Sequence, residues 1–152
     1  MASSFSATIS AWAEKVPEAI EAVLKGSAQD LVKEMQTELN RLVYDAPPAP
    51  SGYVRTGFLR ASLVASTEAM PQLVRDNPGA PVSADEMAGI ILVINGWDGG
   101  GTLYLGYTAR YGYHVFVGAN GTVPKPWVTL AAQKWNEIVQ RRAAAVRQAF
   151  GL

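Results

Sequence analysis

His114 is the first residue to consider for chemistry, because the chain holds one histidine and no cysteine. Without cysteine there is no thiolate zinc site, iron–sulfur cluster or cysteine nucleophile, and a single histidine excludes a multi-histidine metal site. A catalytic triad would depend on His114, yet no serine stands in a G-x-S-x-G motif. The alternating pattern around it predicts a strand over residues 113–117. We therefore interpret His114 as a packing or interface residue of that strand.

Acidic residues give no stronger candidate. Asp98 lies in the glycine-rich stretch 96–101, which lacks the lysine and the serine or threonine of a phosphate-binding loop. This stretch is typical of a flexible hairpin tip. Asp85 and Glu86 form one acidic pair in a loop, which is more typical of a helix start or a solvated patch than of acid–base catalysis. The residues thus predict no catalytic site, no metal site and no cofactor.

The composition favours a subunit of an assembly over an enzyme. Charged residues are 17% of the 152 residues, below the ~25% usual for globular domains, while 49% are hydrophobic. The 13 basic and 13 acidic residues cancel, and zero net charge promotes association. The length suits one domain, which needs no disulfide or metal to hold it together.

Charge is unevenly distributed along the chain. Residues 1–50 hold seven acidic and four basic residues, a net charge of −3, and residues 51–100 have a net charge of −2. Residues 101–152 hold six basic residues against Glu137 alone, a net charge of +5. Two interpretations stay open: the two ends pair within one fold, or the basic end contacts an acidic neighbour or DNA.

Three arginines of the last expected helix, Arg141, Arg142 and Arg147, make up half of this basic end. At ~100° per residue, Arg142 lies off the apolar stripe that contains Ile138. We therefore expect these arginines to point away from the core, toward a neighbouring subunit or a DNA-containing lumen. The neighbouring subunit is favoured, because arginines repeated around a lumen would hold DNA too tightly for it to slide.

Helical periodicity dominates the first third of the chain. Apolar residues recur at steps of three and four, with charged residues on the opposite face. This pattern predicts an amphipathic helix over Pro17–Tyr44, with the proline in its first turn. A helix of that length either kinks at Gly26 or protrudes. Within an N-terminal arm over residues 1–15, residues 5–13 are expected to form a short separate helix or a docking arm.

The remainder of the chain predicts a small sheet and a last helix. Residues 56–63 form a short helical turn or the lead into an extended segment, and residues 70–88 form a long loop. The expected strands are 89–95 and 102–108, paired as a hairpin, and 113–117, before a helix that begins near Trp127. The prediction is one α+β domain over residues 1–152. It has a small antiparallel sheet of three or four strands, with the C-terminal helix packed on the sheet.

Five aromatic residues fall on this expected sheet: Tyr104, Tyr107, Tyr111, Tyr113 and Phe116. An aromatic sheet can stack nucleobases when basic residues are interleaved, but Arg110 is the one basic residue among them. Packing in the core or at a subunit interface is the better interpretation.

The start of the chain and its apolar runs argue against export and membrane insertion. Residues 1–10 lack the basic and long apolar segments of a secretory leader. The longest strongly apolar run, residues 89–94, is far shorter than the ~20 residues of a membrane span. We expect the protein to be made in a cytosol, and to stay there or in a particle assembled there.

Three motifs follow the first helix in a fixed order. Thr56, Gly57, Leu59, Arg60 and Ser62 belong to the segment TGFLRAS, which follows a proline-rich connector that includes Pro50. Tyr111 and Gly118 bound the second motif, with His114 between them. Pro124, Pro126 and Trp127 lead into the last helix.

This order resembles the minor tail-component family of tailed double-stranded DNA bacteriophages, also called neck or tail-completion proteins. The resemblance covers about residues 16–150. The chain departs from the family at two points: Trp127 stands where the family usually has phenylalanine, and the acidic residue that usually precedes the glycine of the second motif is missing.

The resemblance implies a virion structural protein that acts at the head–tail junction or at the top of the tail. It implies a homo-oligomeric ring, with six copies expected, next to a tail terminator, tail tube or head-closure protein. Genomic DNA would pass without sequence-specific contact. The family pattern contains no catalytic residue and implies no cofactor and no membrane contact. Such a protein would be assembled in the bacterial host cytoplasm and would reside in the virion.

The motif residues suit structural roles. Thr56 is expected to cap the following turn, Gly57 to permit a tight backbone, and Leu59 to anchor the segment in the core. Arg60 is expected to pair with an acidic group of the long helix or of a neighbour. Pro126 is expected to set where the final helix begins.

Two other functions are alternatives. The first is a small nucleic-acid-binding protein that uses the basic last helix, although a dedicated DNA binder rarely has zero net charge. The second is a small-molecule enzyme built around His114 and Asp98, for which the sequence offers little support.

Overall fold

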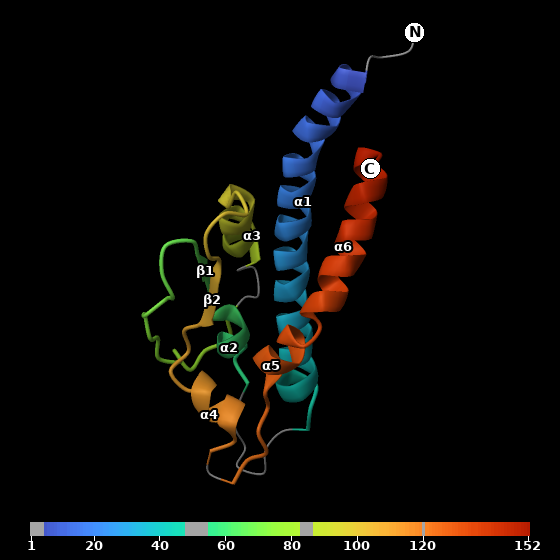
Figure 1. The fold of residues 1–152 in the computed structure, drawn as a ribbon. Coiled ribbons are helices and arrows are strands. Elements are labelled where there is room, and N and C mark those ends of the chain that lie inside the picture. Colours follow the sequence, from blue (N-terminus) through green and yellow to red (C-terminus); the bar gives the residue numbers. More distant parts are fainter. Residues whose placement is uncertain (1–4, 48–54, 83–86, 120) are drawn as a thin grey trace.

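A single long helix forms the spine of the molecule (Figure 1). The computed structural model describes residues 5–47, 55–82, 87–119 and 121–152. One side of the spine carries the last helix, and the other side carries a small sheet with three short helices. Pro50 of the first motif and the acidic pair Asp85 and Glu86 lie outside the described residues.

Helix α1 (Phe5–Leu39) continues directly into a short π-helical segment, η1 (Asn40–Tyr44). The prediction of a long first helix ending at Tyr44 is confirmed, but residues 5–13 are not a separate helix and Gly26 does not interrupt it. Pro17 lies inside the helix rather than in its first turn. A proline at such a position removes a backbone hydrogen bond, and the first turns lean away from the rest of α1 (Figure 1).

The sheet has two antiparallel strands, β1 (Leu63–Ser66) and β2 (Tyr104–Tyr107), with Leu63 opposite Tyr107 and Ser66 opposite Tyr104. Helix α2 (Phe58–Ala61) immediately precedes β1, so a helical turn and an extended segment follow each other as expected. The prediction of three or four strands is wrong for the described residues, because two of the expected strands are helices.

Helix α3 (Met87–Gly96) stands where a strand was expected at 89–95, so the expected hairpin is also wrong. A short, fully apolar run has no periodicity that distinguishes a strand from a helix. Burial shows the helical spacing: Ile90 and Ile94 are buried, whereas Leu92 between them is 72% exposed. A strand would place all three on one face.

Helix α4 (Gly112–Val117) stands where a strand was expected at 113–117. It ends at Gly118, whose φ of 77° is the left-handed conformation typical of a helix C-terminus. Val115 and Phe116 pack against the core, whereas Tyr113 and His114 are exposed. Adjacent residues therefore share a side, which is a helical arrangement and not the alternation of a strand.

The aromatic residues expected on one sheet divide between two elements. Tyr104 and Tyr107 lie on β2, whereas Tyr111 precedes α4, and Tyr113 and Phe116 lie in it. The prediction of a five-residue aromatic sheet is therefore wrong.

The last helical stretch is two helices, α5 (Trp127–Ala132) and α6 (Trp135–Phe150). α6 lies along α1 rather than on the sheet, which corrects the predicted packing (Figure 1). Its one buried residue is Ile138. A helix with such a narrow apolar stripe fits against a single helix better than against a sheet.

Two clusters of buried side chains form the core. The first joins α1, α3, β1 and α5, with Val32 and Ile94 fully buried in it. The second joins the end of α1 to α2 and α5 through Leu39, Leu59 and Trp127. The second cluster lies where the sequence motifs come together.

The long loop expected at 70–88 is described up to residue 82. Residues 70–82 hold no helix or regular strand, and Arg75 forms one isolated bridge with Ala109. The loop is shorter than expected at its far end, because α3 begins at Met87. Within the described ranges, no helix is both long enough and apolar enough to span a membrane.

Candidate functional site

The three sequence motifs meet at the end of α1, although they lie far apart in the sequence. Leu59 of the first motif and Trp127 of the third belong to the second core cluster, and Tyr111 of the second motif packs against it. Trp127 is 2% exposed. The rings of Tyr107 and Phe116 meet it edge to face, with centroids 5.2 and 5.8 Å away. Trp127 therefore joins β2, α4 and α5.

Backbone geometry explains the small residues of the first motif. Gly57 has a left-handed φ of 80°, and a Cβ there would lie 3.3 Å from the backbone oxygen of Val82. The N-cap of α2 is Gly57 rather than the expected Thr56, but the Thr56 hydroxyl accepts a hydrogen bond from the Phe58 N–H at 3.3 Å. The buried Ser62 hydroxyl donates to a carbonyl of α2 at 2.7 Å. Together these residues shape the turn from α2 into β1.

Arg60 reaches the end of the long helix through neutral partners. Its Nη1 donates to Asn40 Oδ1 at 2.9 Å, and its guanidinium lies 4.8 Å from the centroid of the Tyr44 ring. Its backbone carbonyl accepts from Gln36 Nε2 at 3.0 Å. The expected ion pair with the long helix is wrong among the described residues, because an amide and an aromatic ring occupy the positions that Arg60 reaches.

Arg55 caps the same helix end. Its Nη1 donates to the carbonyl oxygens of Tyr44 and Ala46 at 3.0 and 2.5 Å, and its Nη2 donates to that of Pro47 at 2.8 Å. The last carbonyls of a helix have no intrahelical donor and carry the negative end of the helix dipole. The Arg55 guanidinium donates hydrogen bonds to carbonyl oxygens at this end and places a positive charge at the negative end of the dipole. The sequence pattern does not predict this role for Arg55.

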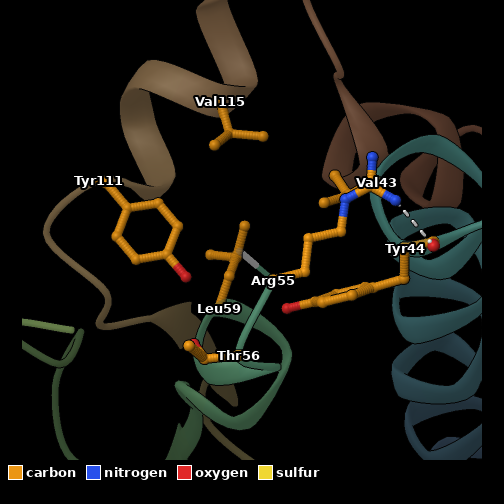
Figure 2. A pocket seen from close by; sticks show the side chains of 7 residues that line it. All are labelled: Val43, Tyr44, Arg55, Thr56, Leu59, Tyr111 and Val115. Atoms are coloured by element: carbon orange, nitrogen blue, oxygen red, sulfur yellow. Dashed lines mark hydrogen bonds between the residues drawn. The ribbon is translucent and has the colours of Figure 1, made fainter. Parts of the chain in front are cut away.

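A small pocket opens between η1, α2 and α4 (Figure 2). It is lined by Val43, Tyr44, Arg55, Thr56, Leu59, Tyr111 and Val115. Its volume of about 30 Å³ suits a single water molecule. Among the described residues, this pocket is too small for a small-molecule substrate.

The two residues considered for chemistry are exposed and lie on different segments. His114 lies on the solvent side of α4, with its ring centroid 6.1 Å from that of Tyr113. Asp98 follows α3, where its Oδ1 accepts from the Gly100 N–H at 2.8 Å in a local turn. Neither lines the pocket. The described part of the chain holds no group of three or more acidic or histidine side chains that could bind a metal.

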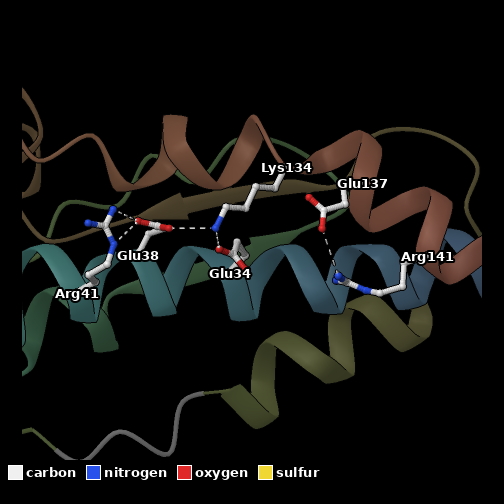
Figure 3. Close-up of polar contacts among 6 residues, drawn as sticks. All are labelled: Glu34, Glu38, Arg41, Lys134, Glu137 and Arg141. Atoms are coloured by element: carbon white, nitrogen blue, oxygen red, sulfur yellow. Dashed lines mark hydrogen bonds and ion pairs between the residues drawn. The ribbon is translucent and has the colours of Figure 1, made fainter.

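Ion pairs of Lys134 join α1 to the segment between the last two helices (Figure 3). Lys134, between α5 and α6, pairs with Glu34 and with Glu38, the latter at 3.2 Å. The Glu38 side chain, 8% exposed, also pairs with Arg41 at 2.5 Å. Because a buried charge is costly without partners, the two cations are what allow Glu38 to be buried.

Arg142 of α6 forms a second attachment farther along α1. Its guanidinium donates two hydrogen bonds to the Asp30 carboxylate, at 2.5 and 2.8 Å. Gly26 leaves room for it, since a Cβ there would lie 3.0 Å from Arg142 Cδ. The expectation that Arg142 points away from the core is therefore wrong, because α1 offers it a carboxylate and a gap. The acidic first third and the basic end of the chain therefore pair in part within the fold.

The other two arginines of α6 are exposed. Arg141 lies 3.9 Å from Glu137, one turn earlier, and both side chains are more than half exposed, so this pair contributes little. Arg147 lies in the last turn of α6, where its charge complements the helix dipole. Of the three arginines, these two present their charge to solvent.

The ion pairs change the pKa values of the groups that form them. Hydrogen bonds from Arg142 hold the pKa of Asp30 below its ordinary value of 3.8. Burial raises the pKa of Glu38, but hydrogen bonds from Arg41 and Lys134 outweigh it, so the net pKa lies below the ordinary value of 4.5. The carboxylates raise the pKa of Lys134 and of Arg142 in turn.

Acid is expected to weaken the fold through these contacts. Folding lowers the pKa of Asp30 and Glu38, so their stabilisation is complete above the ordinary values of 3.8 and 4.5 and is lost as pH falls through the lower, folded values. The free energy of unfolding, measured by urea denaturation, should fall between about pH 5 and pH 2.

A double variant, Asp30→Asn with Glu38→Gln, tests the assignment of this acid sensitivity. It should be less stable near neutral pH and should lose less stability on acidification. Glu137→Gln, at an exposed position, should keep the wild-type pH dependence. An unchanged acid response in the double variant would show that other carboxylates cause it.

Among the described residues, large apolar side chains are exposed in five places. They are Ile9, Trp12 and Ile20 on α1, Met70, Leu73 and Val74 in the loop, Leu92 on α3, Tyr113, Val117 and Val123 in or after α4, and Leu152 after α6. Grouped exposed apolar residues mark interaction surfaces more often than isolated ones do. Three of the five places hold such a group.

The candidate site is therefore a packed junction at the end of α1, together with exposed apolar groups on α1, the loop and α4. No family model, no curated protein and no solved structure matches this chain.

Proposed function

We propose that this chain is a virion structural protein of a tailed bacteriophage or a phage-derived particle, at the head–tail junction or the top of the tail. It forms a homo-oligomeric ring, with six copies expected, that completes the tail or joins it to the filled head. Its neighbours are a tail terminator, tail tube or head-closure protein. Genomic DNA passes through the ring without sequence-specific contact. The role is assembly and involves no catalysis.

The convergence of the three motifs carries this proposal. Leu59, Tyr111 and Trp127 come from the motifs that resemble the minor tail-component family, and all three pack at one core cluster. Each motif is short, and any one alone would be weak support. Their common packing gives each motif a structural reason for its residue types, as expected if the motifs define one fold unit.

The exposed apolar groups also support a ring. A ring is closed by contacts between two different faces of each subunit. Leu73 and Val74 in the loop and Tyr113 and Val117 on α4 provide apolar side chains on two separate elements. They are suited to serve as two unlike contact faces.

The nucleic-acid-binding alternative has less support. Arg142 and Lys134, two of the basic residues near the C-terminus, are paired with carboxylates of α1. Affinity for DNA grows with the number of phosphates that basic side chains neutralise. Because Arg142 and Lys134 pair within the fold, they are less available to neutralise phosphates.

Arg60→Ala is expected to reduce both stability and the yield of joined particles. The change removes the hydrogen bond to Asn40 and the contact with the Tyr44 ring, at a cost of about 1–2 kcal/mol in the free energy of unfolding. Arg60→Lys should be intermediate, because lysine keeps the charge without the planar group. Urea denaturation and counts of infectious particles measure the two effects.

The matched control for this prediction is Arg110→Ala. Arg110 pairs with Asp76 while both side chains are largely exposed, so its loss should change stability little. An Arg60→Ala variant that gives normal numbers of infectious particles would reject the link between this motif and assembly.

Deleting the gene for this chain tests the proposed function. Cells that produce the particle without it should accumulate filled heads and separate tails, and supplying the chain from a plasmid should restore joined particles. Electron microscopy of lysates counts the three species. Joined and infectious particles in the absence of the chain would overturn the proposal.

A further inference from the structure

Helix α1 extends well beyond the part that α6 covers (Figure 1). The two helices run antiparallel: Lys134 pairs with Glu38, and Arg142, eight residues on, pairs with Asp30, eight residues nearer the start of α1. Continued at ~1.5 Å per residue, this spacing places the end of α6 near residue 20 of α1. Ala19 is 6% exposed, so α1 is covered as far as this residue. Residues 5–18, the helical arm, therefore project about 21 Å beyond the covered part.

One face of this helical arm is apolar and exposed. Ile9 and Trp12 are 48% and 56% exposed, and Ile20 at its base is 56% exposed. With Val16 they follow steps of three and four residues, which places them on one side of the helix. By the same helical spacing, the two glutamates of the helical arm lie on the opposite side. The apolar face is thus free of carboxylates.

A helix of this kind is poorly stable without a partner. Isolated helices shorter than ~12–15 residues are marginal in water, and most helical stability in proteins comes from packing of an apolar face. Pro17 removes a backbone hydrogen bond at the point where the helical arm leaves the covered part of α1. The helical arm is nevertheless helical from Phe5 onward. We therefore expect another apolar surface to pack against its apolar face.

We infer that the helical arm of a second copy of this chain fills that role, in a two-fold, antiparallel pair of arms. An overlap over residues 5–20 places the two-fold axis between Trp12 and Ala13. The Trp12 side chains then lie at the centre of the pair, and Ile9 of each copy lies opposite Val16 of the other. The contact is isologous, so each contact between apolar residues is made twice.

Two features favour a second copy over another occupant. First, the pairing leaves the glutamates of both arms in solvent, so that no like charges meet across it. Second, an overlap over residues 5–20 brings the first turn of each α1 to the end of the other copy's α6. The positive end of one helix dipole then meets the negative end of the other. The first turn of α1 contains no acidic residue of its own that would place a negative charge at the positive end of its dipole.

Sedimentation velocity and native mass measurement of the full chain, over a range of concentrations, test this inference. In free solution, before any ring forms, the wild-type chain should be a dimer. Trp12→Glu should weaken this dimerisation about 100-fold or more, because it places two carboxylates at the centre of the pair. Leu92→Glu is the matched control. It places the same charge on another exposed apolar residue and should leave the dimer intact.

Cross-linking gives a second readout, because the natural chain has no cysteine. Ala13→Cys should form an intermolecular disulfide on oxidation, whereas Glu18→Cys, on the opposite face of the helical arm, should not. A monomeric wild-type chain would overturn the inference. So would a dimer that survives Trp12→Glu, or one that Leu92→Glu disrupts equally.

The pairing does not depend on the proposed function. A chain that dimerises through Trp12 but is absent from tailed particles would keep this inference and reject the virion role. A monomeric chain that is present in those particles would do the reverse.

Discussion

Replacing Trp127 with alanine is expected to lower the free energy of unfolding by about 3–5 kcal/mol, the usual cost of removing a large buried aromatic side chain. Trp127 is 2% exposed, and the rings of Tyr107 and Phe116 pack edge to face against it. Its loss leaves a cavity between β2, α4 and α5 that no neighbouring side chain is placed to fill without moving. Urea denaturation of the purified chain measures the change.

The control for Trp127→Ala is Leu73→Ala. Leu73 is 64% exposed, so its truncation should change the free energy of unfolding by about 0.5 kcal/mol or less. Trp127→Phe should recover part of the loss, because a ring still fills part of the space. If Trp127→Ala cost no more than Leu73→Ala, the junction at the end of α1 would not be the core that we describe.

Gly118→Ala is expected to have a comparable effect for a different reason. Gly118 has a φ of 77°, and a Cβ there would lie 2.5 Å from the Thr122 carbonyl oxygen and 2.6 Å from the Pro124 nitrogen. The left-handed backbone alone costs about 1–2 kcal/mol for a residue with a Cβ. The overlap with the backbone adds about 1–3 kcal/mol, because the chain must shift to relieve it.

Gly121→Ala separates these two contributions. Gly121 also has a left-handed φ, of 76°, but a Cβ there meets nothing within 4 Å. Its substitution should therefore cost the backbone strain alone, and urea denaturation should show Gly118→Ala to be the more destabilising of the two. Equal losses at the two positions would contradict the close approach of the chain at Gly118.

The helices at the two ends of the chain could be predicted because they are long and amphipathic. Apolar residues at steps of three and four specify a helix wherever enough turns repeat the pattern. The middle of the chain offered no such repeat. The apolar run of α3 suits a buried strand equally well, and α4 is too short for a period to show. The sequence therefore predicts strands where α3 and α4 lie, and a larger sheet than the two strands of the described residues.

The candidate site was only partly predictable. Leu59 and Trp127 were singled out from their motifs, and both are buried where those motifs meet. The opposite charges of the two ends of the chain indicated that the ends could pair. Which residues pair could not be read from the sequence, because the Asp30–Arg142 contact depends on the antiparallel path of α6 and on the gap at Gly26.

A cryo-electron microscopy difference map tests the proposed function most directly. It compares tailed particles from cells that make the chain with the filled heads and tails from cells that do not. The account predicts a ring of density at the top of the tail or the head–tail junction, present only when the chain is made, into which copies of α1 and the two-stranded sheet fit. Identical density in both samples, with particles joined in each, would contradict it.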